Sequence, residues 1–511
     1  MLKHLFPLFP LFPHEEAADP LDAAARSLFG IPYLLPYQKL VIAGILEAAE
    51  ALRAPAEGGM PDDDRRCLRH RIVILPTGAG KSLCFQVPAL FLDGVTVVIY
   101  PLLALMADQV RRLEERGIEA AVLRGGQSPA ERGAQWEKLR SGRSRFLITN
   151  PETLLAAAAR ERLKTLRIAH LVIDEAHCVS EWGETFRPSY LNIRAIIDSA
   201  SPLLVSAFTA TASAAVLEKI RAGIFGTSGA HTVMANPDRP SITYGAVGCV
   251  LRDGAVQDLL AKSERPALVF CSSRVGAQTL ARFLRTGLRD KEIRFYHAGL
   301  SRQEKALVEN WFFSSAQGIL AATCAYGMGM DKPDIRTVIH RDCPPSVEAY
   351  LQESGRAGRD GGPARAVLLF GPEDRRRLVR AGSPAERERQ VKLIEYAEGA
   401  GQCRRAALLR MLDYQGEPEA PRYGCCDVCA GTAKNILREE PGLTAFFRRN
   451  PRRFTIAEAS RELSSGAGPG IFSASEAFKA VQGLLEQGSL RQTGGFFWKG
   501  AITLNKKASK G

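Results

Sequence analysis

Short runs of β-branched and apolar residues alternate with helical patterns along most of this 511-residue chain. Alternation of this kind predicts parallel strands whose crossover helices cover both faces of a sheet. One set of runs ends near residue 235 and a second set follows it. They are RIVIL at Arg71, VTVVIY at Val95, RFLIT at Arg145, HLVID at His170 and LLVSAF at Leu203, then ALVFC at Ala267, RFYH at Arg294, GILAAT at Gly318, RTVIH at Arg336 and ARAVLLF at Ala364. The sequence therefore predicts two α/β lobes.

The length exceeds what one hydrophobic core organises, so several domains are expected. We predict an N-terminal Pro-rich arm at 1–19, lobes at 20–235 and 236–372, a helical cysteine-containing module at 373–433 and a small winged-helix-like domain with a basic tail at 434–511. The arm repeats Leu-Phe-Pro three times, which favours an extended segment. Such an arm either lies on its own domain or docks a protein partner.

The net charge of +13 favours polyanionic partners such as nucleic acids. Of the eleven cysteines, four gather late in the chain and the others are scattered singly, a pattern typical of a reducing compartment. The apolar start is interrupted by prolines and is a poor signal peptide. No stretch approaches the roughly 18 apolar residues that span a bilayer. A cytoplasmic protein is expected, associated with the nucleoid if the source is bacterial.

The segment LPTGAGKS, residues 75–82, closes a predicted strand and opens a predicted helix, the context of a phosphate-binding loop. Its glycines let backbone N–H groups face phosphates, Lys81 can bridge the β- and γ-phosphates, and the Ser82 hydroxyl can ligate Mg²⁺. The alternative is a glycine turn that precedes a helix and binds no phosphate. The expected ATP contacts of the loop are Thr77, Gly78, Gly80, Lys81 and Ser82.

The predicted strand at His170 ends in Asp174-Glu175-Ala176-His177. An aspartate at the carboxyl end of a neighbouring parallel strand can hold the Mg²⁺, and Glu175 can polarise the attacking water. With the phosphate loop, this motif indicates nucleotide hydrolysis. Asp174, Glu175 and His177 therefore join Lys81 in the expected catalytic set.

The second lobe contains QESGRAGRDG from Gln352. Its two arginines, Arg356 and Arg359, are predicted to lie on one helical turn and to present parallel guanidinium groups. Arg359 is the better candidate for an arginine finger, a role worth about 10³ to 10⁵ in rate. The alternative is a basic surface patch. A finger from the second lobe would make hydrolysis depend on both lobes, as a motor requires.

These motifs resemble superfamily 2 helicases, and DEAHCVSEWGETFRPSYLNI from Asp174 is similar to the RecQ family. The resemblance covers roughly residues 25–433. Within FGIPYLLPYQ, Gln38 would contact adenine, and Asp331 would contact the nucleotide. Other matching segments are LLALMADQV at Leu102, TATAS at Thr209, YHAGLS at Tyr296 and TCAYGMGMDKPDIRTVIH at Thr323. The resemblance implies two RecA-like lobes, a zinc module and a winged helix.

By the same resemblance, residues 180–190 form an aromatic-rich loop that senses single-stranded DNA. Trp182 and Phe186 would stack on bases, and Arg187 would contact phosphate or the other lobe. Without the resemblance, the two rings would be read as core residues. Relatives usually carry His and Asp where this chain has Glu184 and Thr185.

The resemblance implies an ATP- and Mg²⁺-dependent DNA helicase that moves 3′ to 5′ on single strands, in DNA repair or recombination. Its partners would be single-stranded and tailed duplex DNA, and a monomer is expected. The alternatives are an ATPase that remodels or anneals DNA or RNA without processive unwinding, and a zinc-dependent DNA-binding adaptor with a vestigial ATPase.

Four cysteines stand where the family has a structural zinc site, and four thiolates suit tetrahedral zinc. Tyr423 occupies the usual first position of the later cluster, and two of the cysteines are adjacent, which we expect to require a strained turn. A three-cysteine or metal-free remnant is the alternative. The expected ligands are Cys403, Cys425, Cys426 and Cys429.

The tail reads as helices followed by a hairpin, SLRQTGGFFWKGAITLN, with a tight turn expected at Gly494-Gly495. Phe496 and Trp498 share one face of the predicted strand. They are either core residues of the small domain or a wedge at a DNA strand junction. Phosphate contacts are expected from Lys499 and from Lys506, Lys507 and Lys510.

Overall fold

The computed structural model describes residues 19–54, 61–181, 188–226, 229–327, 332–378, 383–434, 436–467, 473–494 and 499–505. The chain divides into two compact units, Met1–Pro237 and Asp238–Gly511. The Leu-Phe-Pro repeats lie outside the described residues. Among the described helices, none is both long and apolar enough to cross a membrane.

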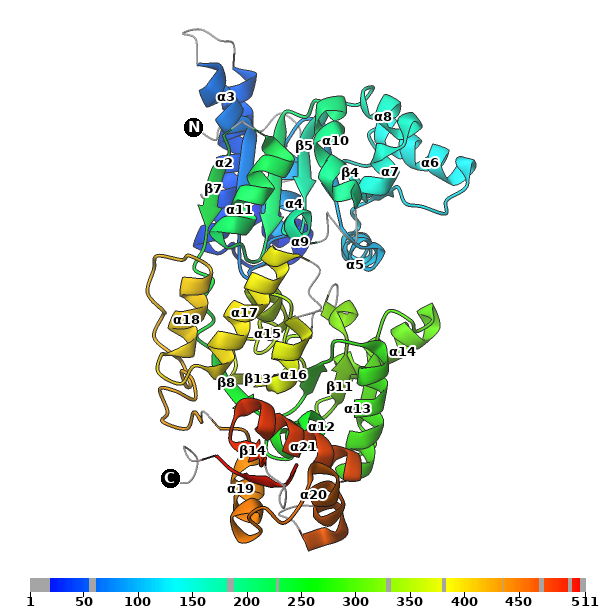
Figure 1. The fold of residues 1–511 in the computed structure, drawn as a ribbon. Helices are drawn as coiled ribbons and strands as arrows, with labels where there is room; N and C mark the ends of the chain where they lie inside the picture. The colour runs from blue at the N-terminus through cyan, green and yellow to red at the C-terminus, as the bar shows by residue number, and fades with distance from the viewer. Residues whose placement is uncertain are drawn as a thin grey trace. The chain divides into compact units, whose positions relative to one another are not determined.

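The first unit, coloured blue to green in Figure 1, is built on a single sheet covered by helices. The sheet has seven strands in the order β3-β4-β2-β5-β6-β1-β7, and every pair is parallel. The strands are β1 His70–Ile74, β2 Val95–Ile99, β3 Ala120–Val122, β4 Phe146–Thr149, β5 Ile168–Ile173, β6 Leu204–Thr209 and β7 His231–Met234. Each predicted run of this lobe coincides with a strand. The sequence prediction missed β3, which has three residues, and the edge strand β7, which is half exposed.

Helices cover both faces of this sheet, as predicted. Successive strand residues point to opposite faces, so Ile72 and Val73 of β1 belong to different hydrophobic clusters. One face packs on α1, α2, α4 and α5, and the other on helices from α6 to α11. The helices are α1 Pro20–Phe29, α2 Pro36–Arg53, α3 Asp62–Arg69, α4 Leu83–Phe91, α5 Leu103–Glu114, α6 Pro129–Arg140, α7 Pro151–Leu155, α8 Ala157–Leu163, α9 Cys178–Glu181, η2 Pro188–Asn192, α10 Ile193–Ala200, α11 Ala214–Ile220 and η3 Arg221–Phe225.

The second unit has a six-stranded parallel sheet in the order β10-β11-β9-β12-β13-β8. Its strands are β8 Ile242–Gly248, β9 Ala267–Phe270, β10 Ile293–Tyr296, β11 Ile319–Ala322, β12 Thr337–His340 and β13 Ala364–Phe370. The edge strand β8 was not predicted, because its glycines interrupt the apolar run ITYGAVG. The helices between these strands are α12 Arg252–Leu260, α13 Arg274–Gly287, α14 Arg302–Ser314, η4 Cys324–Gly327 and α15 Val347–Ser354.

The strand pattern stops after β13, and the chain continues as α16 Pro372–Leu378, α17 Pro384–Glu398 and α18 Arg404–Met411. The cysteine segment that follows lies along the free edge of β8. The N–H of Tyr244 donates to the carbonyl of Cys425 at 3.3 Å, and the N–H of Asp427 donates to that of Tyr244 at 3.0 Å. The cysteine module is thus joined to the sheet of the second lobe.

The tail forms three helices, α19 Glu440–Arg449, α20 Ile456–Glu462 with the η5 turn Leu463–Ala467, and α21 Ala474–Gln487, and an antiparallel pair, β14 Leu490–Gln492 and β15 Ile502–Leu504. This is the predicted helices-and-wing pattern, around a core that includes Phe447, Val481 and Ile502. The tight turn predicted at Gly494-Gly495 lies partly outside the described residues, since Gly495 is not among them. Beyond the pair Gln492–Ile502, the N–H of Thr493 donates to the carbonyl of Ala501 at 2.8 Å, and the N–H of Gly500 donates to the carbonyl of Thr493 at 3.0 Å.

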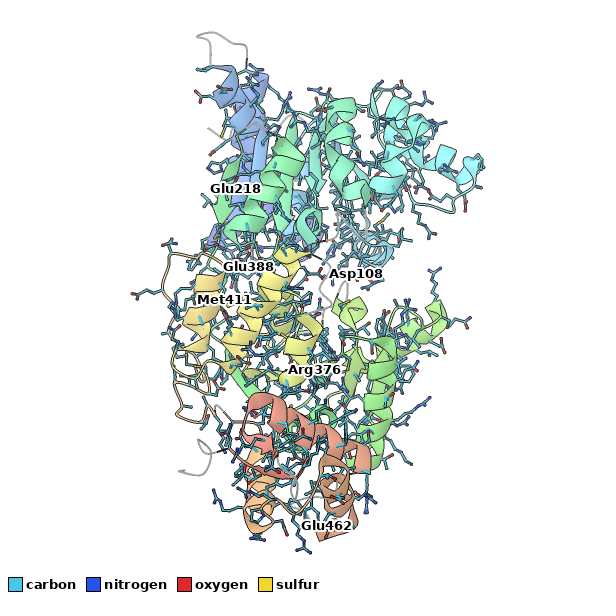
Figure 2. All side chains as sticks on the ribbon, in the orientation of Figure 1. Asp108, Glu218, Arg376, Glu388, Met411 and Glu462 are labelled. Atoms are coloured by element: carbon cyan, nitrogen blue, oxygen red, sulfur yellow. The ribbon has the colours of Figure 1, made fainter. Side chains whose placement is uncertain are left out.

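The small domain is bonded directly to the second lobe. The carboxylate of Glu439, 8% exposed, accepts from the N–H groups of Val250 (2.9 Å) and Leu251 (3.2 Å), where α12 begins. The side chain of Arg376 on α16, labelled in Figure 2, lies 3.4 Å from the carboxylate of Glu486 on α21. The start of α12 therefore depends on a carboxylate from the tail.

Replacing Glu439 with Ala should destabilise the protein by about 1 to 3 kcal/mol, because two buried N–H groups lose their acceptor. The urea midpoint would measure this. The neighbouring pair Arg438–Asp258 is more exposed, at 36% and 56%, so Asp258→Asn serves as the control and should cost less than about 1 kcal/mol. Equal losses for the two variants would contradict the assignment.

Candidate nucleotide, metal and nucleic-acid sites

The segment 75–82 leaves β1 and enters α4 as a tight loop. Gly78 and Gly80 adopt left-handed φ angles of 85° and 70°. The left-handed φ favours glycine at position 80, and a Cβ there would lie 2.5 Å from the Nε2 of Gln38, so that side chain would have to move. Ser82 is the residue before α4, and its hydroxyl makes no capping bond to that helix. The loop has the backbone form that a phosphate-binding site needs.

Residues at the start of α2 hold this loop from the side. Gln38 Nε2 donates to the carbonyl of Ala79 at 2.9 Å, and Gln38 Oε1 accepts from the N–H of Leu35 at 2.8 Å. The Tyr37 hydroxyl also donates to the Ala79 carbonyl, at 3.2 Å. The sequence prediction missed Tyr37, and its position next to Gln38 was the only signal. Gln38, the predicted adenine contact, is therefore hydrogen-bonded to the phosphate-binding loop.

The DEAH residues lie beside Lys81. Lys81 Nζ lies 3.4 Å from Glu175 Oε1, and the two side chains are 13% and 14% exposed. Glu175 has a φ of 49°, a strained value for a glutamate and one that often marks a functional site. Its N–H donates to Asp174 Oδ1 at 2.9 Å. Lys81, Asp174 and Glu175 thus form one cluster of charges at the loop.

The strand that carries Asp174 is not the neighbour of β1, so that prediction is wrong. In the observed order β6 lies between β5 and β1, and it contributes Thr209 from its carboxyl end. The Thr209 hydroxyl lies 3.1 Å from Nδ1 of His177, which is also 3.4 Å from Glu175 Oε2. Thr209 is therefore a further residue that orients the DEAH motif.

Burial and the negative charge of Glu175 raise the pKa of Asp174 to about 6, while the charge of Lys81 acts in the opposite direction. The side chain is 7% exposed. Ionisation of Asp174 is therefore less favourable in the protein than in water. A divalent cation at this carboxylate would relieve that penalty, as expected of a Mg²⁺ ligand.

The structure corrects the prediction that Arg356 and Arg359 share a helical turn. Helix α15 carries Gln352 and ends at Ser354, and the two arginines follow in a turn. Within this turn Gly358 has a left-handed φ of 55°, and a Cβ there would lie 2.7 Å from the carbonyl oxygen of Gly362. Arg356 is 4% exposed and Arg359 is half-buried. We call residues 355–359 the arginine loop.

The four predicted cysteine ligands come together. Their sulfur atoms all lie within 4.8 Å of one another, and those of Cys403 and Cys425 are 3.4 Å apart. Zinc–thiolate bonds of about 2.3 Å place tetrahedral ligands about 3.8 Å apart, so this donor set fits the ion. Cys403 precedes α18, and although burial acts to raise its pKa, N–H groups of the first turn lower it below the usual value. Neither Cys425 nor Cys426 has a left-handed φ, so the expected strained turn is absent there.

Several predicted contacts lie outside the described residues: Asp331, Trp182, Phe186, Arg187, Phe496, Trp498, Lys506, Lys507 and Lys510. Lys499 is described and is exposed in the connection between β14 and β15.

Two parallel-sheet lobes, with a phosphate loop and a DEAH motif in the first, define a helicase-type fold. The family model "DEAD/DEAH box helicase" matches residues 36–220, and "Helicase conserved C-terminal domain" matches residues 252–361. Among solved structures, the DEAD-box helicase Mss116 aligns with a TM-score of 0.56 at 16% identity, covering 92% of each chain. The DUF1998 helicase MrfA aligns with a TM-score of 0.54 at 18% identity, covering 97% of this chain and 64% of its own. These likenesses show the fold.

The chain belongs to the RecQ family of superfamily 2 helicases. It is 31% identical to the ATP-dependent DNA helicase RecQ of Bacillus subtilis over 83% of this chain and 72% of the relative. It is 35% identical to RecQ of Pasteurella multocida, over 71% of this chain and 58% of the relative. The chain thus spans less than two thirds of the Pasteurella protein and, at 59%, of RecQ from Haemophilus influenzae.

Replacing Asp174 with Asn should stabilise the nucleotide-free protein at neutral pH. Because the folded pKa of Asp174 is about 6 against 3.8 ordinarily, the folded state binds this proton more tightly than the unfolded state. Stability therefore falls as the pH rises from about 4 to about 6, by at most about 3 kcal/mol. Urea midpoints of wild type and Asp174→Asn should agree near pH 4 and separate above pH 6. A wild type that gained relative stability over that interval would contradict the shift.

Metal analysis of the purified protein should find about one zinc per chain, because four cysteine sulfur atoms within 4.8 Å of one another can supply the complete ligand set of a structural zinc ion. Cys426→Ser should lower this content and the thermal midpoint. Cys67→Ser is the control, since Cys67 lies outside the cluster and should keep both values unchanged. Wild-type protein without zinc would remove the assignment.

Proposed function

We propose that the protein is an ATP- and Mg²⁺-dependent DNA helicase that translocates 3′ to 5′ on single-stranded DNA and separates duplexes, in DNA repair or recombination. The observation that carries this proposal is the charge cluster of Lys81, Asp174 and Glu175 beside a glycine loop, in a RecQ-family chain. Two relatives bear the name ATP-dependent DNA helicase, which supports DNA as the partner.

Residues of the first unit have separate roles in ATP hydrolysis. The backbone of the glycine loop and Lys81 bind the phosphates of ATP, and Gln38 fits an adenine contact. Ser82 and Asp174 would hold Mg²⁺, which neutralises phosphate charge when bound. Glu175 accepts the proton of the attacking water, and His177 orients Glu175. When ATP binds, the ammonium group of Lys81 therefore leaves the carboxylate of Glu175 and contacts the phosphates instead.

The second unit would contribute the arginines that stabilise the charge of the transition state, and both units would contribute to DNA coupling. Arg359 would act as the arginine finger, with Arg356 and Gln352 beside it. The aromatic residues Trp182 and Phe186 would couple DNA to hydrolysis from the first unit. The thiolates of the cysteine cluster would hold zinc as a structural ion that takes no part in the reaction. The hairpin, with Lys499 exposed, would meet the duplex.

The proposal predicts ATP hydrolysis that single-stranded DNA stimulates more than RNA does. A fluorescent duplex with a 3′ tail should be separated in the presence of ATP and Mg²⁺, and one with a 5′ tail should not. Lys81→Ala and Glu175→Gln should each lower hydrolysis by about 10² or more, since each removes a group that touches the reacting phosphate or water. Glu218→Gln, on the exposed face of α11, is the control and should keep wild-type rates.

ATP hydrolysis without strand separation would favour the alternative of a remodelling or annealing ATPase. ATP hydrolysis and strand separation that are unchanged in Lys81→Ala would contradict the proposal that the protein is an ATP-driven motor.

A further inference from the structure

The arginine loop is held from within the second unit by Arg239, a residue outside the predicted site. Arg239 Nη1 donates to the carbonyl of Gly355 at 2.8 Å. Its Nη2 donates to the carbonyls of Ala357 (3.1 Å) and Gly358 (3.3 Å). These three carbonyl oxygens flank Arg356 in the chain and directly precede Arg359. One guanidinium group therefore fixes the backbone that presents both arginines.

The position of Arg239 is in turn fixed by its neighbour. Asp238 Oδ1 accepts the N–H of Arg239 at 2.8 Å, and Oδ2 accepts the N–H of Glu419 at 2.7 Å. The same carboxylate pairs with the guanidinium of Arg405, whose Nε lies 3.0 Å from Oδ1. The Asp238 and Arg405 side chains are only 2% and 1% exposed. Because the main chain is clamped here, the Arg239 side chain is aimed at the loop.

Arginine suits this task better than other residues. Its planar fork donates to several acceptors at once, whereas a lysine ammonium is a compact point charge on a flexible stem. The loop turns back on itself at Gly358, so its carbonyls converge on one side. Burial lowers the pKa of the Arg239 guanidinium, and the charge of nearby Arg359 acts in the same direction. The hydrogen bonds to the loop offset that cost, and the two arginines are near enough to interact.

We propose that Arg239 is a positioning residue for the arginine finger: it fixes the backbone of residues 355–358 so that Arg359 is held ready for the γ-phosphate. This inference rests on the proposed ATPase function. Asp238 and Arg405 extend the same hydrogen-bonded path to the cysteine module, since Arg405 is the second residue after Cys403. The segment that begins the second unit thereby connects the cysteine module to the arginine loop.

The first test measures DNA-stimulated ATP hydrolysis by Arg239→Ala, Arg239→Lys and Arg359→Ala. Arg239→Ala should lower kcat by about 10 to 10², the scale of a misplaced catalytic group, while KM for ATP changes less than about threefold. Arg239→Lys should recover part of the loss. Arg239→Ala added to Arg359→Ala should lower kcat no further, because the finger on which Arg239 acts is already gone.

Arg265→Ala is the matched control. Arg265 lies in the same unit, pairs with Asp290, reaches the carbonyl of Gln317, and is 19% exposed, but it does not contact the arginine loop. Its removal should leave kcat and KM at wild-type values. Asp238 is unsuitable as a test site, because its loss would leave Arg405 buried without its partner and could unfold the protein.

A second measurement does not depend on turnover. Amide hydrogen exchange over residues 355–361 should accelerate in Arg239→Ala and remain at wild-type rates in Arg265→Ala, with both proteins folded by thermal midpoint. Unchanged exchange in Arg239→Ala, or an additive loss of kcat in the double variant, would overturn the positioning role while leaving the helicase proposal intact. A wild type that hydrolyses no ATP would overturn the helicase proposal and this inference with it.

Discussion

Every strand pair in both large sheets is parallel, and the placement of the chemistry depends on this constraint. Parallel strands end at the same edge, and each must return through a crossover to the opposite edge. Residues that follow strands therefore gather although they are far apart in sequence. Lys81 and Glu175, 94 residues apart, meet in this way. The same gathering buries Asp174 next to the carboxylate of Glu175, and both effects raise the pKa of Asp174.

The sequence predicted the strands that are buried on both faces, because their apolar runs leave a direct pattern. It missed β3, β7 and β8, which are short, exposed or interrupted by glycine, since edge strands are defined by pairing rather than by composition. The sequence pattern also could not predict the order of the strands in the sheet. The insertion of β6 between β1 and β5 follows from the crossover geometry of the whole lobe and not from any local spacing.

The site was predictable where function restricts residue type along a short segment, as in the glycine loop and the cysteine cluster. The arginine loop was predicted in content but not in shape. The sequence pattern is compatible with a helix through Arg359, whereas α15 ends at Ser354 and the chain then turns, with a left-handed φ at Gly358. Arg239 gave no signal at all. An arginine that follows a proline and an aspartate forms no recognisable motif. The role of Arg239 is visible only in its hydrogen bonds to three carbonyls, which lie more than a hundred residues further along the chain.

The contact between the cysteine segment and β8 has a consequence for the behaviour of the protein in solution. An uncovered edge strand offers free N–H and C=O groups to any other chain and is a common start of aggregation. In the second sheet, the segment around Cys425 and Asp427 occupies that edge at Tyr244. Unfolding of the cysteine module would therefore expose the backbone groups of Tyr244 to strands of other chains.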